Sequence, residues 1–281
     1  MSINNFIPEI WAAELLQGRA AATKFASPLV CNRDYEGTIA GQGSTVHITS
    51  IGDPTVTAYT KGGTLTYEDL VDASRALVVD QAYEFSFKID DIDKRQSVNG
   101  GSLMSDAATR GGRSLARTSD SYVQALLEAD VASANKIGAT SITTSALAVA
   151  RLVAHKQLLD ENDVPEDGRY TIVPSWFHSL LVLDDRFVAY DSLAQKGMLQ
   201  NGRVGTALGF EIVQANYALS AGDDWYVYSG HPDAVTFADQ INEVEALRLQ
   251  TTFGDGLRGL HLYGAKVTRP SEICMTLCSV T

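Results

Sequence analysis

The strongest pattern in the chain is an alternation of apolar and polar residues that begins at Leu77 and ends at Asp90. One parity is apolar apart from Gln81, and the other is mostly polar or charged. This period predicts a strand with one buried face and one face in water. At about 3.3 Å per residue it would extend about 45 Å, too far for a compact domain of this size. We therefore expect part of it to belong to an arm that projects from the body.

After the acidic turn at residues 90–93 the apolar spacing changes to about 3.6, which predicts a long helix from Ser102 to Ala134. A continuous helix of this extent would be about 50 Å long. Gly111 and Gly112 interrupt the pattern, but the apolar stripe resumes in register, so we expect a bend there and not an end. Arginines at spacings of three and four residues share one side of this helix: Arg110, Arg113 and Arg117.

The N-terminal residues predict a separate docking element. Asn4 to Gly18 has the pattern of a short amphipathic helix, whose apolar face includes Ile10 and Trp11. It precedes any domain core, so we expect it to dock either on its own body or on a neighbouring molecule.

A β-ribbon is predicted from Thr45, where two alternating stretches flank the turn signal at residues 61–63. Such a ribbon is at best marginally stable alone, so it needs a partner. Lys61 lies at its tip, and Glu68 and Asp69 follow on the return. A solvated hairpin end is the alternative interpretation of these charges.

The remainder of the chain mixes helices and strands without regular alternation, which favours an α+β fold. We expect a helix from Thr144 or Ser145 to Leu159 and a second helix from Ser175. Residues 196–209 read as an exposed loop, and Ile241 to Gln250 is ambiguous between helix and strand. Further strands are predicted at residues 170–173, 187–190, 210–214, 225–228, 234–238 and 259–268.

Composition narrows the class of protein. The chain has 281 residues, 45% of them hydrophobic, enough for one large or two modest cores. The net charge of -12 opposes binding of nucleic acid by the whole surface, although the three arginines could meet phosphate locally. No apolar run is long enough for a membrane span, and no basic leader with an apolar core is present, so we expect no membrane partner and a cytoplasmic site of synthesis.

Residues that could carry chemistry are sparse. Gly112 to Ala116 comes close to a nucleophile-elbow motif, but it lies inside the helical pattern. The acidic turn lacks the glycine and terminal glutamate of a calcium loop, and the five histidines are scattered. The three cysteines suit buried apolar positions better than disulfides or zinc. We therefore predict no catalytic residue, no cofactor and no metal site.

Several short motifs occur together and in order along the chain. These are Phe6 to Trp11, Val79-Asp80-Gln81, Tyr83-Glu84-Phe85, Ile89 to Asp93 with Gln96, Val164-Pro165 with Gly168-Arg169, Gly230-His231-Pro232, Phe253-Gly254-Asp255 and Tyr263 to Val267. In this combination the sequence resembles the major capsid (coat) proteins of tailed double-stranded DNA bacteriophages, which have the Hong Kong 97-like fold.

The resemblance implies an α+β Hong Kong 97-like fold with four parts. These would be an N-terminal arm at 1–44, an extended β-hairpin loop at 45–80, a peripheral domain with the spine helix at 81–138 and 239–281, and an axial domain at 139–238. It implies a structural virion protein, not an enzyme, that assembles in the bacterial host cytoplasm into the hexamers and pentamers of an icosahedral shell.

Partners implied by the resemblance are further copies of the chain, a scaffolding protein, a portal protein and packaged double-stranded DNA held by non-specific contacts. The predicted subunit contacts are Ile10, Trp11, Lys61, Glu68, Asp69, Arg110, Arg113 and Arg117. One branch of the family crosslinks a loop lysine to an asparagine, and Lys61 sits suitably, but no matching asparagine signature is present. An encapsulin-like cellular compartment of the same fold is the alternative, and an enzyme of unknown class is a third hypothesis.

Overall fold

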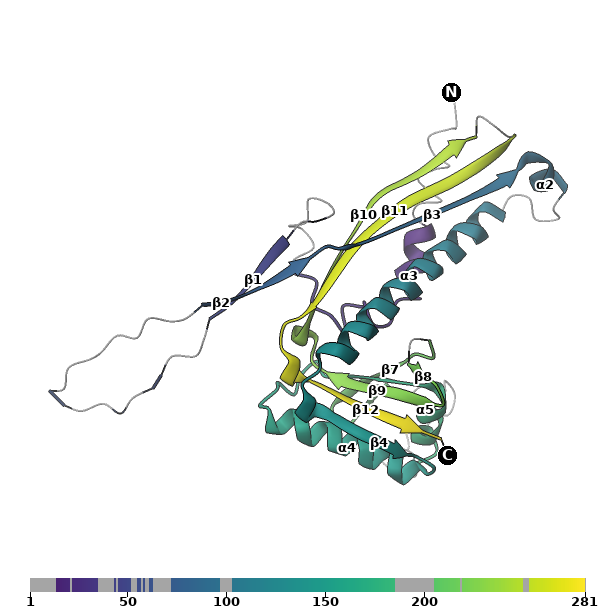
Figure 1. The fold of residues 1–281 in the computed structure, drawn as a ribbon. Helices are drawn as coiled ribbons and strands as arrows, with labels where there is room; N and C mark the ends of the chain where they lie inside the picture. Colours follow the sequence, from purple (N-terminus) through teal and green to yellow (C-terminus); the bar gives the residue numbers. More distant parts are fainter. Residues whose placement is uncertain are drawn as a thin grey trace.

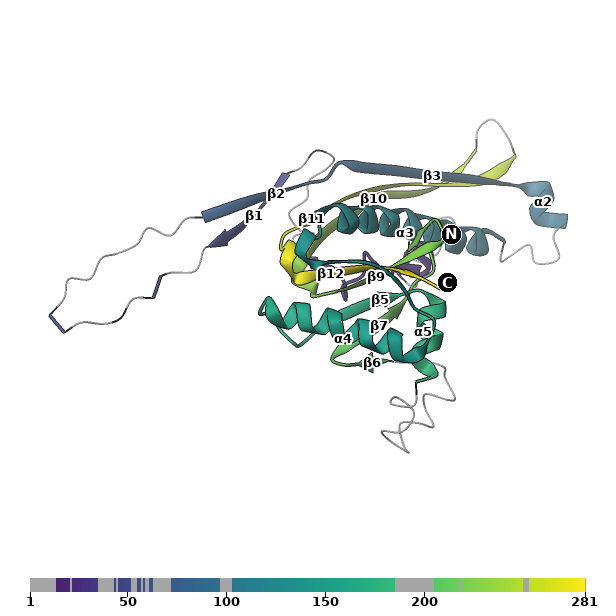
Figure 2. The ribbon, with the colours of Figure 1, turned by 60° about the horizontal axis from the view of Figure 1, so that its bottom comes forward.

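The computed structural model describes residues 14–20, 22–34, 43, 45–51, 55–56, 58, 61–62, 72–96, 103–184, 205–217, 219–249 and 253–280. Over this part the chain is a mixed α+β protein with two sheets, a projecting ribbon and one long helix between the sheets (Figures 1 and 2). None of the described helices combines the length and the apolar character that a bilayer crossing requires.

The first sheet has three long antiparallel strands in the order β10-β11-β3. A β-bulge near Ile241 interrupts the register between β10 and β11. The segment after Ile241 that was ambiguous in the sequence is therefore a strand, because its backbone groups pair along β11. The bounds are β3 (Gln81–Asp90), β10 (Val235–Arg248) and β11 (Gly254–Val267), with the short helix α2 (Asp91–Gln96) after β3.

The ribbon pairs β1 (Thr45–Ile51) with β2 (Asp72–Val78) and points away from the body in both views (Figures 1 and 2). Its base is anchored, because Val46 and Leu77 are buried against β10 and β11. At the far end Lys61 and Gly62 form a turn, and Gly62 has a φ of +84°, which glycine tolerates best. The predicted turn is therefore present at these two residues.

The single strand predicted from Leu77 to Asp90 is in fact two strands. β2 ends at Val78 and β3 begins at Gln81, so the chain passes from the ribbon to the three-stranded sheet across Val79 and Asp80. The alternation itself is confirmed, since Leu77 and Val79 are buried and the opposite parity is exposed through residue 88. A side chain at Gly264 of β11 would collide with this crossing, because its Cβ would lie 2.4 Å from the Val78 carbonyl oxygen.

The long helix α3 (Leu103–Asp130) runs through both glycines without a break. Its N-terminal half packs on the three-stranded sheet through Ala108 and Leu115. Its C-terminal half packs on the second sheet through Val123 and Leu127. Figure 2 shows α3 lying between the two sheets, so one helix joins both cores.

The second sheet has the strand order β4-β12-β9-β5-β7-β6, and β8 pairs with β9. The helices α4 and α5 cover the face away from α3, and Leu152, Phe177 and Leu181 lie in the core between them and the sheet. The bounds are β4 (Lys136–Ser141), α4 (Ser145–Glu161), β5 (Tyr170–Val173), α5 (Ser175–Val182), β6 (Thr206–Ala207), β7 (Phe210–Gln214), β8 (Ser220–Ala221), β9 (Asp224–Gly230) and β12 (Ile273–Ser279).

This pairing corrects the expected division of the chain. Residues 239–281 were assigned as a whole to the unit of the spine helix, yet β12 pairs with β9 and β4 in the second sheet. The boundary at 138/139 falls inside β4, and the one at 238/239 falls inside β10. The physical reason is long-range backbone pairing, which places strands from distant parts of the chain in one sheet.

The described part of the N-terminal segment docks on its own body, which was one of the two alternatives expected for it. Residues 14–20 are helical, and the segment 14–34 is part of the body, because Leu15, Phe25 and Val30 are completely buried. The body therefore includes part of the range 1–44 that was expected to form the N-terminal arm. Apolar burial accounts for this docking. Residues 1–13, the strand expected at 187–190 and most of the loop expected at 196–209 lie outside the described residues.

Candidate functional site

The candidate site is the surface where β3 meets α3. β3 is an edge strand, so its outer side has no strand partner among the described residues. A groove of about 680 Å³ runs between β3 and α3. Phe85 and Phe87 line it from the strand, and Gly111 and Leu115 line it from the helix. We call this surface the β3/α3 groove.

Apolar side chains of the groove are only half covered. Phe85 and Phe87 are half-buried, and Tyr83 is 42% exposed. By contrast, Leu15 and Leu257 in the same apolar cluster are almost fully buried. Apolar side chains at the centre of the sheet are therefore closely packed, whereas those along β3 stay partly exposed.

The three predicted arginines are all exposed on α3, but they do not form one uniform stripe. Arg110 lines the β3/α3 groove. The guanidinium of Arg117 lies over the ring of Tyr217, 5.7 Å from its centre, so the chain itself holds this side chain. Within the described part of the chain Arg110 and Arg113 form no ion pair, and neither has a ring contact like that of Arg117, so their charges are more accessible to another molecule.

The other predicted contact residues are only partly described. Lys61 is exposed at the far turn of the ribbon, and Val56 on the same ribbon is 94% exposed. Ile10, Trp11, Glu68 and Asp69 lie outside the described residues.

Two buried carboxylates fasten the N-terminal segment to the body. Asp120 of α3 accepts hydrogen bonds from the backbone N–H groups of Lys24, Phe25 and Ala26 at 2.8, 3.0 and 2.8 Å. It also accepts one from the hydroxyl of Tyr217. Burial raises the pKa of Asp120, while these hydrogen bonds act in the opposite direction. The carboxylate replaces water for three backbone donors that would otherwise be unsatisfied.

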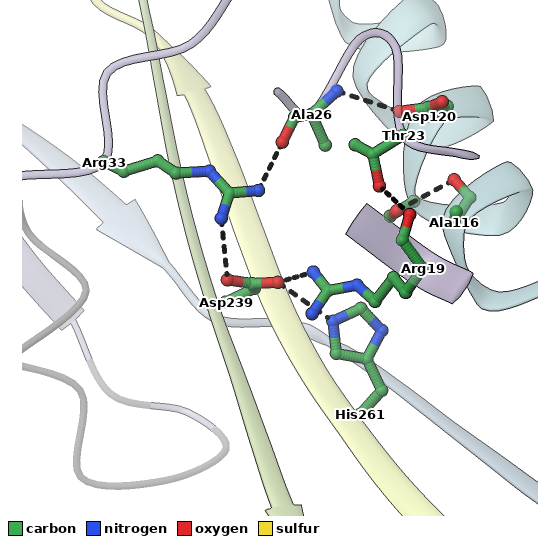
Figure 3. A network of polar contacts seen from close by, with 9 residues as sticks. Arg19, Thr23, Ala26, Arg33, Ala116, Asp120, Asp239 and His261 are labelled. Carbon is green, nitrogen blue, oxygen red and sulfur yellow. Dashed lines mark hydrogen bonds and ion pairs between the residues drawn. The ribbon is translucent and has the colours of Figure 1, made fainter. Parts of the chain in front are cut away.

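Asp239 of β10 is the second carboxylate (Figure 3). It pairs with Arg19, and the guanidinium Nη1 of Arg33 lies 3.6 Å from its Oδ1. Nε2 of His261 lies 3.4 Å from the other oxygen. Burial, with the charges of Arg19 and Arg33, lowers the pKa of His261 to about 3. The contact from His261 is therefore a hydrogen bond from a neutral ring and not an ion pair at neutral pH.

Sequence reasoning did not find either carboxylate. The sequence offered only a weak signal for them: Asp120 interrupts the apolar pattern late in the helix, and Asp239 follows a largely apolar stretch. Nothing in the local pattern connects them to residues about a hundred or more positions earlier.

Sequence reasoning also did not predict that a histidine of α4 is buried against the second sheet. Nδ1 of His155 lies 2.7 Å from the hydroxyl of Ser229, and its Nε2 lies 2.6 Å from that of Thr276. The Thr171 hydroxyl lies 2.8 Å from that of Ser229. All four side chains are fully buried, so this network satisfies polar groups inside the core.

Comparisons with known proteins identify the family of the chain. The sequence profile of the family described as "Phage capsid protein" matches residues 78–275, more than half of the chain. The chain therefore belongs to the phage capsid protein family. Family membership implies a structural role in the virion capsid.

Solved structures support the same conclusion. A chain of Mycobacterium phage Che8 is 30% identical, with a TM-score of 0.73 over 90% of each chain. The capsid structure of the cyanophage P-SCSP1u matches at 19% identity and a TM-score of 0.67, over 86% of this chain and 85% of that one. The virus-like particle from Pyrococcus furiosus matches at 13% identity and a TM-score of 0.59, over 94% and 96%. The last two show the fold alone, which is Hong Kong 97-like. No curated protein sequence matches significantly.

Proposed function

We propose that the chain is the major capsid protein of a tailed phage, and that it forms hexamers and pentamers of an icosahedral shell around double-stranded DNA. One observation supports this most strongly: the ribbon projects from the body while the β3/α3 groove stays uncovered. In a monomer each surface leaves strand edges or apolar side chains exposed to water, which favours non-specific association. Between copies the same surface can be covered. A scaffolding protein, a portal protein and assembly in the host cytoplasm belong to the same proposal.

Electron microscopy of the purified protein, expressed alone and with its phage partners, tests the shell. We expect closed particles in at least one of these preparations. A stable monomer at high concentration, in the presence of the partners, would contradict the proposal.

An encapsulin-like compartment of the same fold is the second candidate. The likeness to the Pyrococcus furiosus particle concerns the fold, and therefore does not distinguish a virion from a compartment. Extracted particles do: packaged DNA with a portal supports the virion, whereas an enclosed cargo enzyme supports the compartment.

We also propose that the ribbon tip with Lys61 lies over an adjacent subunit, and that Arg110, Arg113 and Arg117 meet acidic groups there. Arg117 already contacts Tyr217, so Arg110 and Arg113 should contribute most. The double variant Arg110→Glu/Arg113→Glu should lose particle formation while the circular dichroism of the unassembled chain stays unchanged. The double lysine variant, which keeps both charges, should assemble. Normal shells from the glutamate variant would disprove the pairing.

Contacts with packaged DNA should be weak and non-specific, because the chain carries a net charge of -12. A crosslink through Lys61 is a separate hypothesis with its own test. Boiled mature particles that give only monomer bands on a denaturing gel would exclude it.

A further inference from the structure

Within the described chain three short turns join the two sheets, and they are gathered in one place. The N–H of Ala132 donates to the carbonyl oxygen of Pro270 at 3.2 Å, so the turn after α3 is bonded to the turn before β12. In Figure 1 the chain passes between the sheets at the C-terminal end of α3. A joint of a few turn residues lets two sheets pivot unless contacts farther away hold both. The turns are η3 (Ser133–Asn135), η4 (Pro232–Ala234) and η5 (Pro270–Glu272).

Residues 22–34 of the N-terminal segment, which we call the strap, contact both sheets. The C-terminal part of the strap is fastened to the first sheet. Asn32 forms a parallel bridge with Thr236 of β10. The guanidinium of Arg33 lies over the ring of Phe237 in the same strand, 5.3 Å from the ring centre. This end of the strap therefore follows β10 wherever that strand lies.

The N-terminal part of the strap is held by the second sheet and by α3. The rings of Phe25 and Tyr228 of β9 meet edge to face, with 5.9 Å between their centres. The carboxylate of Asp120 accepts hydrogen bonds from three backbone N–H groups of the strap. The hydroxyl of Tyr217, in the loop after β7, donates to the same carboxylate and lies 2.7 Å from the carbonyl oxygen of Ala22. Strap, spine helix and second sheet therefore meet at one carboxylate.

A continuous line of polar contacts runs through the strap from β10 to α3 (Figure 3). Asp239 faces the guanidinium of Arg33, which donates to the carbonyl oxygen of Ala26. The N–H of the same Ala26 donates to Asp120. Asp120 lies about 15 Å along the helix axis from the end of α3 at Asp130, and thus well away from the joint. A pivot of one sheet relative to the other would have to break this line.

We propose that the strap is a tie that fixes the angle between the two sheets, and that Asp120 and Tyr217 are the positioning residues that close it. A closed shell repeats one chain many times, so a fixed angle within the chain sets the curvature of the shell. This consequence rests on the proposed shell function. The tie itself is a property of the single chain and can be tested without a shell.

Pulsed electron paramagnetic resonance measures the placement of one sheet relative to the other. Spin labels are attached to the full chain after Lys88→Cys in β3 and Ala150→Cys in α4, which are exposed positions on opposite sides of the joint. The three natural cysteines are buried, and burial raises their pKa values, so they react slowly with the label. Labelled chains are diluted with unlabelled chains, so that only distances within one chain are measured.

Tyr217→Phe opens the tie with the least disturbance, because the ring that Arg117 contacts remains. Tyr226→Phe is the matched control, since it removes a hydroxyl that bonds Glu128 of α3 at 2.7 Å outside the strap. We expect a broader or shifted distance distribution for Tyr217→Phe and for Asp120→Asn, and the natural distribution for the control. If Asp120→Asn does not fold by circular dichroism, Tyr217→Phe alone decides. A natural distribution in Tyr217→Phe would overturn the tie.

Particle diameters test the consequence for the shell. Electron micrographs of Tyr217→Phe particles should show a wider range of diameters than those of the natural protein, whereas Tyr226→Phe particles should match the natural ones. Natural diameters together with an altered distance distribution would overturn the link to curvature. Absence of particles from the natural protein would instead contradict the shell function, and the distance measurement would still decide whether the strap is a tie.

Discussion

At the scale of single residues, adjacent glycines of α3 have different roles. A Cβ at Gly112 would lie 2.3 Å from the carbonyl oxygen of Leu15, whereas one at Gly111 would lie 3.9 Å from the nearest atom, on Phe85. Gly112 therefore lets the N-terminal helical segment approach the spine helix, and Gly111 only weakens the helix.

We expect Gly112→Ala to lower the free energy of unfolding by about 1–3 kcal/mol, because backbone must shift to admit the methyl group. Gly111→Ala is the matched control and should be neutral or stabilising by up to about 1 kcal/mol. Chemical denaturation of the unassembled protein measures both. Equal destabilisation by the two substitutions would contradict this role of Gly112.

Buried neutral histidines predict a loss of stability in mild acid. Burial, with a smaller effect of Arg151, lowers the pKa of His155 to about 3 from an ordinary value of 6.5. The folded state thus favours the neutral ring, so its contribution is complete above pH 6.5 and declines as the pH falls towards 3. The slope is about 1.4 kcal/mol per pH unit for one such group.

His155→Gln should be less stable at pH 7 but should lose less stability between about pH 6.5 and 5 than the natural protein does. The measurement is the denaturation midpoint at several pH values in that interval. His261 remains in the variant and provides the residual slope. A variant with the full natural slope would show that His155 is not responsible.

At the scale of elements, the path from β2 into β3 depends on a second glycine contact. Gly264 of β11 lies where the chain crosses at Val78 and Val79, and a Cβ there would be 2.4 Å from the Val78 carbonyl oxygen. The direction in which the ribbon projects thus depends on the close packing at Val78 and Val79, where the chain passes from β2 to β3, and not on the turn at Lys61.

Gly264→Ala should destabilise the chain by about 1–3 kcal/mol and increase proteolysis at the base of the ribbon, because β2 and β3 must move apart from β11. Gly138→Ala in the edge strand β4 is the control, since a Cβ there meets nothing within 4 Å. Limited proteolysis with mass spectrometry locates the first cuts. First cuts at the same sites in both variants would argue against the crossing as the cause.

At the scale of the whole molecule, the described body begins at the N-terminal segment and joins two cores through α3. Asp120 and Asp239 hold that segment by hydrogen bonds and ion pairs, and Leu15 and Phe25 place it in the apolar interior.

If Ile10 and Trp11 are subunit contacts, the double alanine variant should lose particle formation and keep the unfolding free energy of the unassembled chain. Leu15→Ala is the contrasting variant and should cost about 2–5 kcal/mol, because Leu15 is fully buried. Light scattering and denaturation measure the two properties. A large loss of monomer stability in the double variant would place these residues in the body instead.

Sequence alone determined the local structure and the apolar parity of several elements. The period of two along residues 77–90, the period of 3.6 in α3 and the turn at Lys61 each reflect interactions between near neighbours in the chain. The exposed ribbon could be anticipated for the same reason, since its alternation has no obvious partner within reach. The resemblance motifs likewise led to the family that the profile match shows.

Tertiary structure decided which distant segments meet. It put β12 beside β9, split the long strand at Val79 and buried Leu15, Phe25 and Val30 of the N-terminal segment in the core. It also gave Arg117 a contact with Tyr217, so this arginine differs from Arg110 and Arg113 in its surroundings. These outcomes depend on backbone pairing, close packing at glycines and buried charge between residues far apart in sequence, and no local period encodes them.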